Sequence, residues 1–202
     1  MRRLLLILAL PVLLAACGAE PVWAPDEQVT RAIHSTGEAP SITLYTVVRV
    51  KSDNGEHSGL MINNSHRVIF DPAGTWKSRY APERNDVHFG ITDQLRDFYI
   101  DYHARETYYV VEQTLYVTPE QAEAAMRAAQ SYGAVPKAFC GNSVSDILRD
   151  VPGFEDIPRS FLPGKIMRAF GKKPGVTERI IRDDDSDSNR EVLLRQFATP
   201  PT

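Results

Sequence analysis

The chain contains one cysteine whose setting favours nucleophilic chemistry. Cys140 stands in the segment AFCGNS at residues 138–143, which leads into a predicted helix over residues 142–149. Unpaired amides and the dipole at a helix N-terminus stabilise a thiolate and lower its pKa. The segment therefore predicts a reactive thiolate. The alternative is a small apolar side chain in the core, which is a common role of free cysteine.

A thiolate nucleophile needs a side chain that exchanges its proton at neutral pH, and histidine is the best suited. His57 opens a predicted strand in which Gly59 lies two residues on and on the same face. We expect this glycine to leave space for a substrate beside the imidazole. The next strand ends at Asp71, which would accept a hydrogen bond from the other ring nitrogen, and His66 is the alternative orienting residue. The remaining histidines, expected to be solvated, are His34, His88 and His103.

The other cysteine, Cys17, has a different explanation. Two arginines precede an apolar run over residues 4–14, and two alanines stand directly before the cysteine. The run is too short to span a bilayer as a helix. The pattern resembles a bacterial lipobox, which implies that a signal peptide over residues 1–16 is removed and that Cys17 carries a diacylglycerol. An ordinary secretory signal or a short uncleaved anchor would also place the chain outside the cytoplasm.

Position 18 bears on the destination within the envelope. Gly18 follows the cysteine, whereas an aspartate there retains enterobacterial lipoproteins on the inner membrane. The resemblance therefore implies a lipid-anchored protein of the outer membrane that faces the periplasm. Its expected partners are the membrane, through the diacylglycerol on Cys17, and peptidoglycan.

Composition argues against several classes of function. The net charge of −3 at pH 7 disfavours nucleic acid as a partner. The chain has no Cys/His cluster at zinc spacing and no glycine-rich phosphate-binding motif. The acidic run at residues 183–189 lacks the glycine and glutamate of a calcium loop, so a solvated turn is expected there. We therefore predict neither a metal nor a cofactor.

The length of 202 residues fits one domain with tails. Three prolines and weak apolar periodicity predict a flexible tether over residues 17–40. A domain is expected over residues 41–170 and a C-terminal extension over residues 171–202. The tail carries two predicted segments, an edge strand at 176–181 and a strand or helix at 191–197.

Local patterns within this domain predict an α+β fold, an antiparallel sheet packed against helices. Alternating, β-branched segments predict strands over residues 41–50, 57–62, 66–71 and 107–117. An amphipathic stripe after Thr92 predicts a helix over residues 92–102. Thr118, Pro119 and Gln121 form a capping signature for a second helix that ends at Gly133. A long surface loop is expected over residues 75–90.

A histidine that opens a strand as HSGLMI, followed by a strand with a polar orienting residue and a cysteine at the start of a helix, resembles the papain-like NlpC/P60 superfamily of cysteine peptidases and amidases. His57 precedes Cys140, as in the circularly permuted branch of that superfamily. The resemblance covers residues 41–150. It implies that Cys140 is the nucleophile, His57 the base and Asp71 the orienting residue.

Together these features predict a lipid-anchored thiol hydrolase or acyltransferase of the cell envelope that acts on an amide or ester, with peptidoglycan stem peptides as the natural amide. The alternative is a non-catalytic envelope lipoprotein that uses the same domain for binding or scaffolding. Phe139 and Gly141 beside the cysteine depart from the superfamily's pattern and favour that alternative.

Overall fold

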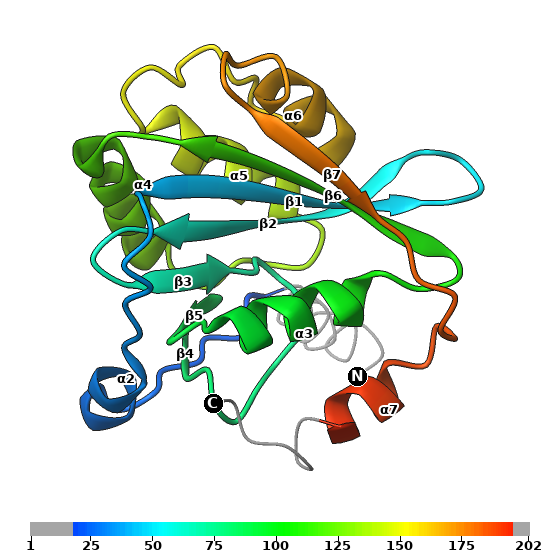
Figure 1. Ribbon diagram of the computed structural model, residues 1–202, viewed down its shortest axis with the longest axis horizontal. Coiled ribbons are helices and arrows are strands. Elements are labelled where there is room, and N and C mark those ends of the chain that lie inside the picture. Colours follow the sequence, from blue (N-terminus) through cyan, green and yellow to red (C-terminus); the bar gives the residue numbers. More distant parts are fainter. Residues whose placement is uncertain (1–17, 196–202) are drawn as a thin grey trace, which may run out of the picture.

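The computed structural model describes residues 18–195. The predicted lipidation residue Cys17 and the predicted signal peptide over residues 1–16 lie outside these residues. The fold is α+β, with a seven-stranded antiparallel sheet in the order β4-β5-β3-β2-β1-β6-β7 (Figure 1). The strands are β1 (Ser41–Arg49), β2 (Gly55–Asn63), β3 (Arg67–Phe70), β4 (Glu83–Arg84), β5 (Val87–Phe89), β6 (Tyr108–Tyr116) and β7 (Thr177–Ile181).

Helices cover both faces of the sheet because both faces are apolar (Figure 1). The six helices of residues 18–195 are α2 (Asp26–Ala32), α3 (Asp93–His103), α4 (Pro119–Tyr132), α5 (Cys140–Arg149), α6 (Pro163–Phe170) and α7 (Asn189–Arg195). On one face, alternate strand residues such as Leu44 and Leu60 pack against α4, α5 and α6. On the other face, Tyr45 and Met61 pack against residues of α3 and α7.

The capping signals in the sequence are confirmed. Thr92 accepts a hydrogen bond from the backbone amide of Leu95 and so starts α3. Thr118 and Gln121 form a reciprocal capping box that starts α4, and Gly133 ends this helix with a positive φ of 89°. The predicted edge strand is β7, which pairs with β6 at the end of the sheet. Residues 191–197 were predicted to form a strand or a helix, and the part that the structure describes is helical.

Residues 18–40, expected to be a flexible tether, lie against the sheet in the structure. Val29 of α2 is 8% exposed and belongs to the main core. The backbone amide of Arg67 donates to the carbonyl of His34, and the buried Arg67 guanidinium pairs with Glu38 at 2.5 Å and with Asp93 at 2.6 Å. Proline content alone did not reveal these contacts, because they are made to distant parts of the chain.

The segment 75–90 is not the surface loop that the sequence predicted. It contains β4 and β5, and Trp76 and His88 within it are each 2% exposed. The two strands are very short, so period-two alternation was not visible. Because β5 pairs with β3 and β4 pairs with β5, the sheet extends beyond β3. The turn between β4 and β5 supports the loop that follows β3.

Within residues 18–195, no helix combines the length and the apolar character needed to cross a bilayer.

The docking of α2 leads to a stability prediction. Val29→Ala should lower the free energy of unfolding by about 1.5 kcal/mol, because it removes two buried methyl groups at roughly 0.8 kcal/mol each. Val22→Ala is the matched control, since Val22 lies in the same segment and is 42% exposed; its effect should stay within about 0.5 kcal/mol. Urea unfolding measures both. Equal effects would mean that α2 does not contribute to the core.

Candidate active site

Cys140 is the first residue of α5, so the prediction that it lies at a helix N-terminus is confirmed. β3 pairs with β2 only from Leu60 to Asn63, so the earlier half of β2 pairs with β1 on one side and has no strand on the other. Cys140 lies at this gap, close enough to the backbone of Ser58 and of Gly141 for both to lower the pKa of its thiol. The cysteine is 7% exposed. The position is therefore a buried one that still offers hydrogen-bond donors to the sulfur.

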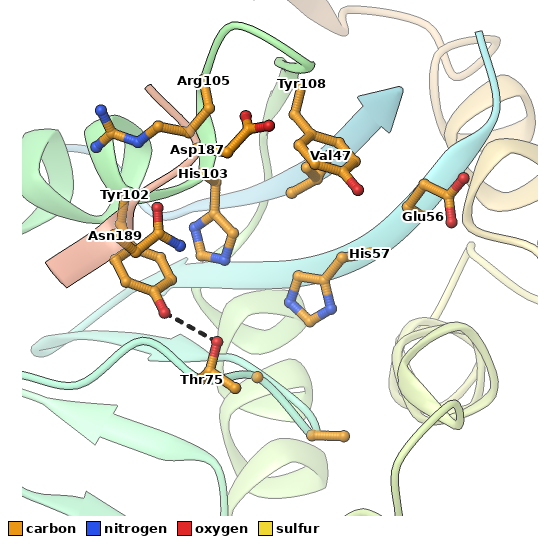
Figure 2. Close-up of a pocket in the computed structure, with 12 residues that line it drawn as sticks. Val47, Glu56, His57, Thr75, Tyr102, His103, Arg105, Tyr108, Asp187 and Asn189 are labelled. Carbon is orange, nitrogen blue, oxygen red and sulfur yellow. Dashed lines mark hydrogen bonds between the residues drawn. The ribbon is translucent and has the colours of Figure 1, made fainter. Parts of the chain in front are cut away.

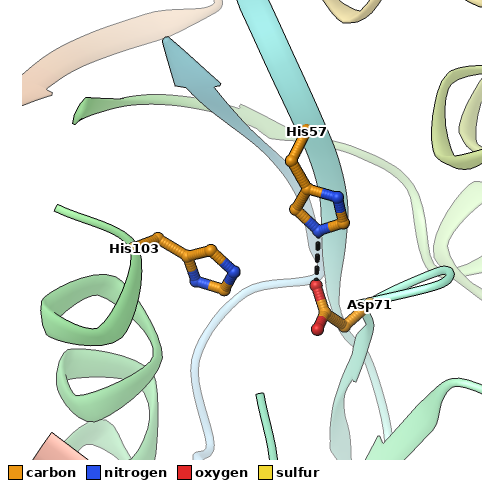
Figure 3. Close-up of side chains that lie close together, drawn as sticks. All are labelled: His57, Asp71 and His103. Atoms are coloured by element: carbon orange, nitrogen blue, oxygen red, sulfur yellow. Dashed lines mark hydrogen bonds and ion pairs between the residues drawn. The ribbon is translucent and has the colours of Figure 1, made fainter. Parts of the chain in front are cut away.

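His57 connects Cys140 to Asp71. Nε2 of His57 lies 2.7 Å from Oδ1 of Asp71, so the nitrogen donates and the carboxylate accepts (Figure 3). This bond leaves Nδ1 as the ring nitrogen that is available to Cys140, with which His57 also interacts. The structure thus brings together the three residues singled out in the sequence.

Asp71, rather than His66, is the residue that orients His57. The Asp71 side chain is completely buried. Its Oδ1 also accepts a hydrogen bond from the hydroxyl of Tyr99 at 2.8 Å. His66 instead contacts Ser65 and stacks on Phe89. A carboxylate with two donors on one oxygen is well suited to fix the orientation of an imidazole.

Electrostatics favour a charged pair. Burial alone would lower the pKa of His57, but the charge of Asp71 and hydrogen bonds to Asp71 and Cys140 raise it to about 10. Burial would raise the pKa of Cys140, yet the hydrogen bond and charge of His57, with the backbone of Ser58 and Gly141, lower it overall. Burial would likewise raise the pKa of Asp71, but His57 holds it well below its usual range. All three shifts favour a thiolate beside an imidazolium.

Two glycines leave space for the side chains of Asp71 and Tyr99. A Cβ at Gly59 would overlap the hydroxyl of Tyr99, and a Cβ at Gly74 would overlap the carboxylate of Asp71. The prediction that Gly59 leaves space for a substrate was therefore wrong, because Tyr99 fills that space. Gly141 is likewise needed for packing, since a Cβ there would lie 2.7 Å from the carbonyl oxygen of Ser160.

His103 is a member of the site that the sequence analysis missed. Its ring stacks on His57, with centroids 5.5 Å apart and planes 8° from parallel (Figure 3). Nδ1 of His103 donates to the backbone carbonyl of Tyr99 at 2.8 Å, and burial lowers its pKa to about 4. Solvation was expected for His103 and for His88, and both expectations were wrong. The four-residue spacing from Tyr99, on one face of a helix, was the signal that could have placed His103 correctly.

A pocket of about 270 Å³ opens on the His57 side of the site (Figure 2). His57, His103, Thr75 and Tyr108 are among the residues that line it, and Cys140 is not. A second hollow of about 390 Å³ shares Ala73, Gly74 and Thr75 with the first and is also lined by Val135 and Lys137, which precede Cys140. The loop after Asp71 thus separates two hollows beside the candidate site.

Ligand atoms of His57, Asp71 and His103 lie within 4.8 Å of one another, which is close enough for one cation. Nε2 of His57 already donates to Asp71, however, so a metal there would have to replace this hydrogen bond. A second group is formed by Asp101, Asp183 and Asp185. Arg105 donates to Asp101 and Asp185 and so compensates part of their charge. Proton transfer therefore describes the first cluster better than metal ligation does.

Comparisons with protein-family models, with curated proteins and with solved structures give no match for this chain.

The neutral state of His103 leads to a prediction about how folding stability depends on pH. The folded protein resists protonation of this ring until about pH 4, whereas the unfolded chain takes up the proton near 6.5. Stability should therefore fall as the pH drops from 6.5 towards 4. His103→Phe keeps a ring but does not titrate, so its free energy of unfolding should fall less over this range. Urea unfolding at pH 7 and pH 4.5 measures the difference, and His34→Phe, outside the cluster, is the control. An unchanged pH dependence in His103→Phe would contradict the buried neutral state.

Proposed function

We propose that this chain is a lipid-anchored thiol hydrolase or acyltransferase of the bacterial cell envelope, acting on an amide or ester. The observation that carries the proposal is the position of His57, which interacts with Cys140 and donates to the buried carboxylate of Asp71. Nucleophile, base and orienting residue in this order form the arrangement used for covalent acyl transfer. Cys140 is the nucleophile, His57 the base and Asp71 the residue that orients it.

The proposed first step forms a bond between Sγ of Cys140 and the carbonyl carbon of the substrate. The carbonyl electrons move to oxygen, and backbone amides near Cys140 would hold this oxyanion. When the electrons return, the bond to the leaving group breaks. The imidazolium of His57 supplies the proton that the leaving amine or alcohol needs. The product of this step is a thioester on Cys140.

The second step releases the acyl group. His57, now neutral, takes a proton from an incoming water or alcohol, whose oxygen attacks the thioester. The carbon–sulfur bond breaks and leaves the thiolate of Cys140 next to the regenerated imidazolium. Water gives hydrolysis and an alcohol gives acyl transfer. The hydrogen bond to Asp71 keeps the same ring nitrogen directed at the sulfur throughout.

For the finer fold, we propose a circularly permuted papain-like domain. The support is a helix that begins with a cysteine and packs on a strand that carries a histidine, with the histidine earlier in the chain. For the location, we propose an anchor through diacylglycerol on Cys17, facing the periplasm. Peptidoglycan stem peptides are then the amide substrate that the enzyme would meet most often.

A non-catalytic binding or scaffolding role is the second candidate. The observation that favours it is the low exposure of Cys140 and its absence from the lining of the 270 Å³ pocket. In this case the sulfur would be a core atom, and the pocket beside His57 would bind a partner without chemistry. The reactivity of the thiol separates the two candidates.

Alkylation by iodoacetamide across pH tests the thiolate. Labelling of the peptide that contains Cys140 should be rapid and should show an apparent pKa below the roughly 8.5 of a free thiol. His57→Gln removes the charge that lowers the pKa of Cys140, so labelling at pH 6.5 should slow by about tenfold or more. His34→Gln is the matched control and should label like the wild type. Labelling that requires denaturant would rule out the enzyme and favour the binding module.

Catalysis itself is tested with peptidoglycan stem peptides and, separately, with a simple ester, by mass spectrometry of the products. Cys140→Ala should abolish turnover, and Asp71→Asn should lower kcat/KM by about 10²–10⁴ because the imidazole loses its orienting acceptor. A short incubation should add the mass of the acyl group to the Cys140 peptide. Turnover that persists in Cys140→Ala would disprove the assigned nucleophile.

A further inference from the structure

The turn between β4 and β5 has an unusual backbone. Asn85 and Asp86 both have positive φ, of 46° and 68°, and Arg84 pairs with Val87 on either side of them. In a two-residue turn of this kind, glycine is the common residue at the second position because a Cβ is unfavourable there. Backbone strain that a fold retains is often associated with function. The contacts of Asp86 indicate what that function is.

Asp86 hydrogen-bonds to two separate segments of the chain. Its backbone carbonyl accepts from the amide of Asp71 at 2.8 Å, and its Oδ1 accepts from the amide of Ala73 at 3.3 Å. Its Oδ2 accepts from the amide of Val135 at 2.7 Å. One residue therefore holds both the loop that carries the orienting carboxylate and the segment that leads to Cys140.

Both segments have little other regular structure at these points. The loop after Asp71 contains Ala73, with a positive φ of 55°, and Gly74, which packs on the Asp71 carboxylate. The segment from Val135 reaches Cys140 through Ala138, which also has a positive φ, of 71°. A shift of either segment would change the separation between Asp71 and Cys140, across which His57 must reach.

The carboxylate of Asp86 is retained at a cost in stability. Burial raises its pKa to about 6, although the amides of Val135 and Ala73 oppose this, and the nearby charges of Glu83 and Asp71 raise it further. A group with a raised pKa in the folded protein destabilises that protein at neutral pH relative to its neutral form. Strain and charge together mean that stability alone does not account for an aspartate at this position.

We propose that Asp86 is a positioning residue for the Cys140–His57–Asp71 site. It holds the Asp71 loop and the Val135 segment at the separation that lets His57 contact both the thiolate and the carboxylate. This inference rests on the proposed function, because the benefit of the fixed separation is the reactivity of Cys140. Asp86 touches none of the reacting atoms and acts through the backbone of its neighbours.

Asp86→Asn tests the proposal, since asparagine tolerates positive φ but offers only one acceptor oxygen to the two amides. The urea midpoint at pH 7 should stay equal or rise, because the buried charge is gone. Alkylation of Cys140 at pH 6.5 should slow by about tenfold, as expected for a small misplacement of interacting groups. The apparent pKa of the thiol should rise as well, which a purely structural residue would not cause.

Asn85→Gly is the control within the same turn. It relieves the positive φ at position 85 and leaves in place the three hydrogen bonds that Asp86 accepts from Asp71, Ala73 and Val135, so alkylation should match the wild type. Amide hydrogen exchange at Val135 and Ala73 provides a readout independent of the thiol, and it should be faster in Asp86→Asn only.

The outcomes separate the two proposals. A wild-type thiol that labels only in denaturant defeats the proposed function and, with it, the role of Asp86. A reactive wild-type thiol with an unchanged profile in Asp86→Asn defeats the positioning role alone. A lower urea midpoint in Asp86→Asn, with the thiol pKa unchanged, would make Asp86 a structural residue and would also overturn the inference.

Discussion

The structure around the candidate site depends on one buried negative charge. The side chain of Asp71 is fully shielded from solvent, and its Oδ1 receives hydrogen bonds from His57 and Tyr99. A carboxylate in such a position is stable only when charge and hydrogen bonds compensate for lost hydration. The imidazolium of His57 provides the charge, and the Tyr99 hydroxyl provides the second donor. Because that imidazolium faces Cys140, the same charge that stabilises Asp71 also favours the thiolate.

Several features of the sheet follow from this requirement. Positions 59 and 74 require glycine, because Tyr99 and Asp71 occupy the space that a side chain would need. Helix α3 must present Tyr99 towards β2, and its Thr92 cap fixes where the helix begins. Since α3 continues to His103, a second imidazole lies beside the first and remains neutral, because burial lowers its pKa by more than the charge of Asp71 raises it. The carboxylate of Asp71 thus keeps His57 charged, while burial keeps the neighbouring His103 neutral.

Local signals in the sequence were sufficient for most elements. The long strands and the two capped helices depend on contacts within a few residues of the chain, and they lie where the patterns predicted. Cys140, His57 and Asp71 could be selected because each stands at the start or end of a predicted element. Tyr99 and His103 were missed because their roles arise from contacts with a distant strand. The docking of residues 18–40 was missed for the same reason, since Arg67 and Val29 make their contacts across the fold. The strands β4 and β5 were missed because they are too short to show alternation.

The sheet order also explains why the nucleophile and base can meet although they come from different layers. Leu60 of β2 faces α5, whereas His57 lies on the alternate side of the strand, with Gly59 and Met61. A continuous β3 would separate the start of α5 from the His57 face. β3 ends at Phe70, so this side of β2 is open where Cys140 approaches the backbone of Ser58. The chain then continues directly to Asp71, so the first residue after the strand is the one that accepts the hydrogen bond from His57. A longer β3 would close this gap, so the length of this one strand controls whether Cys140 can approach β2.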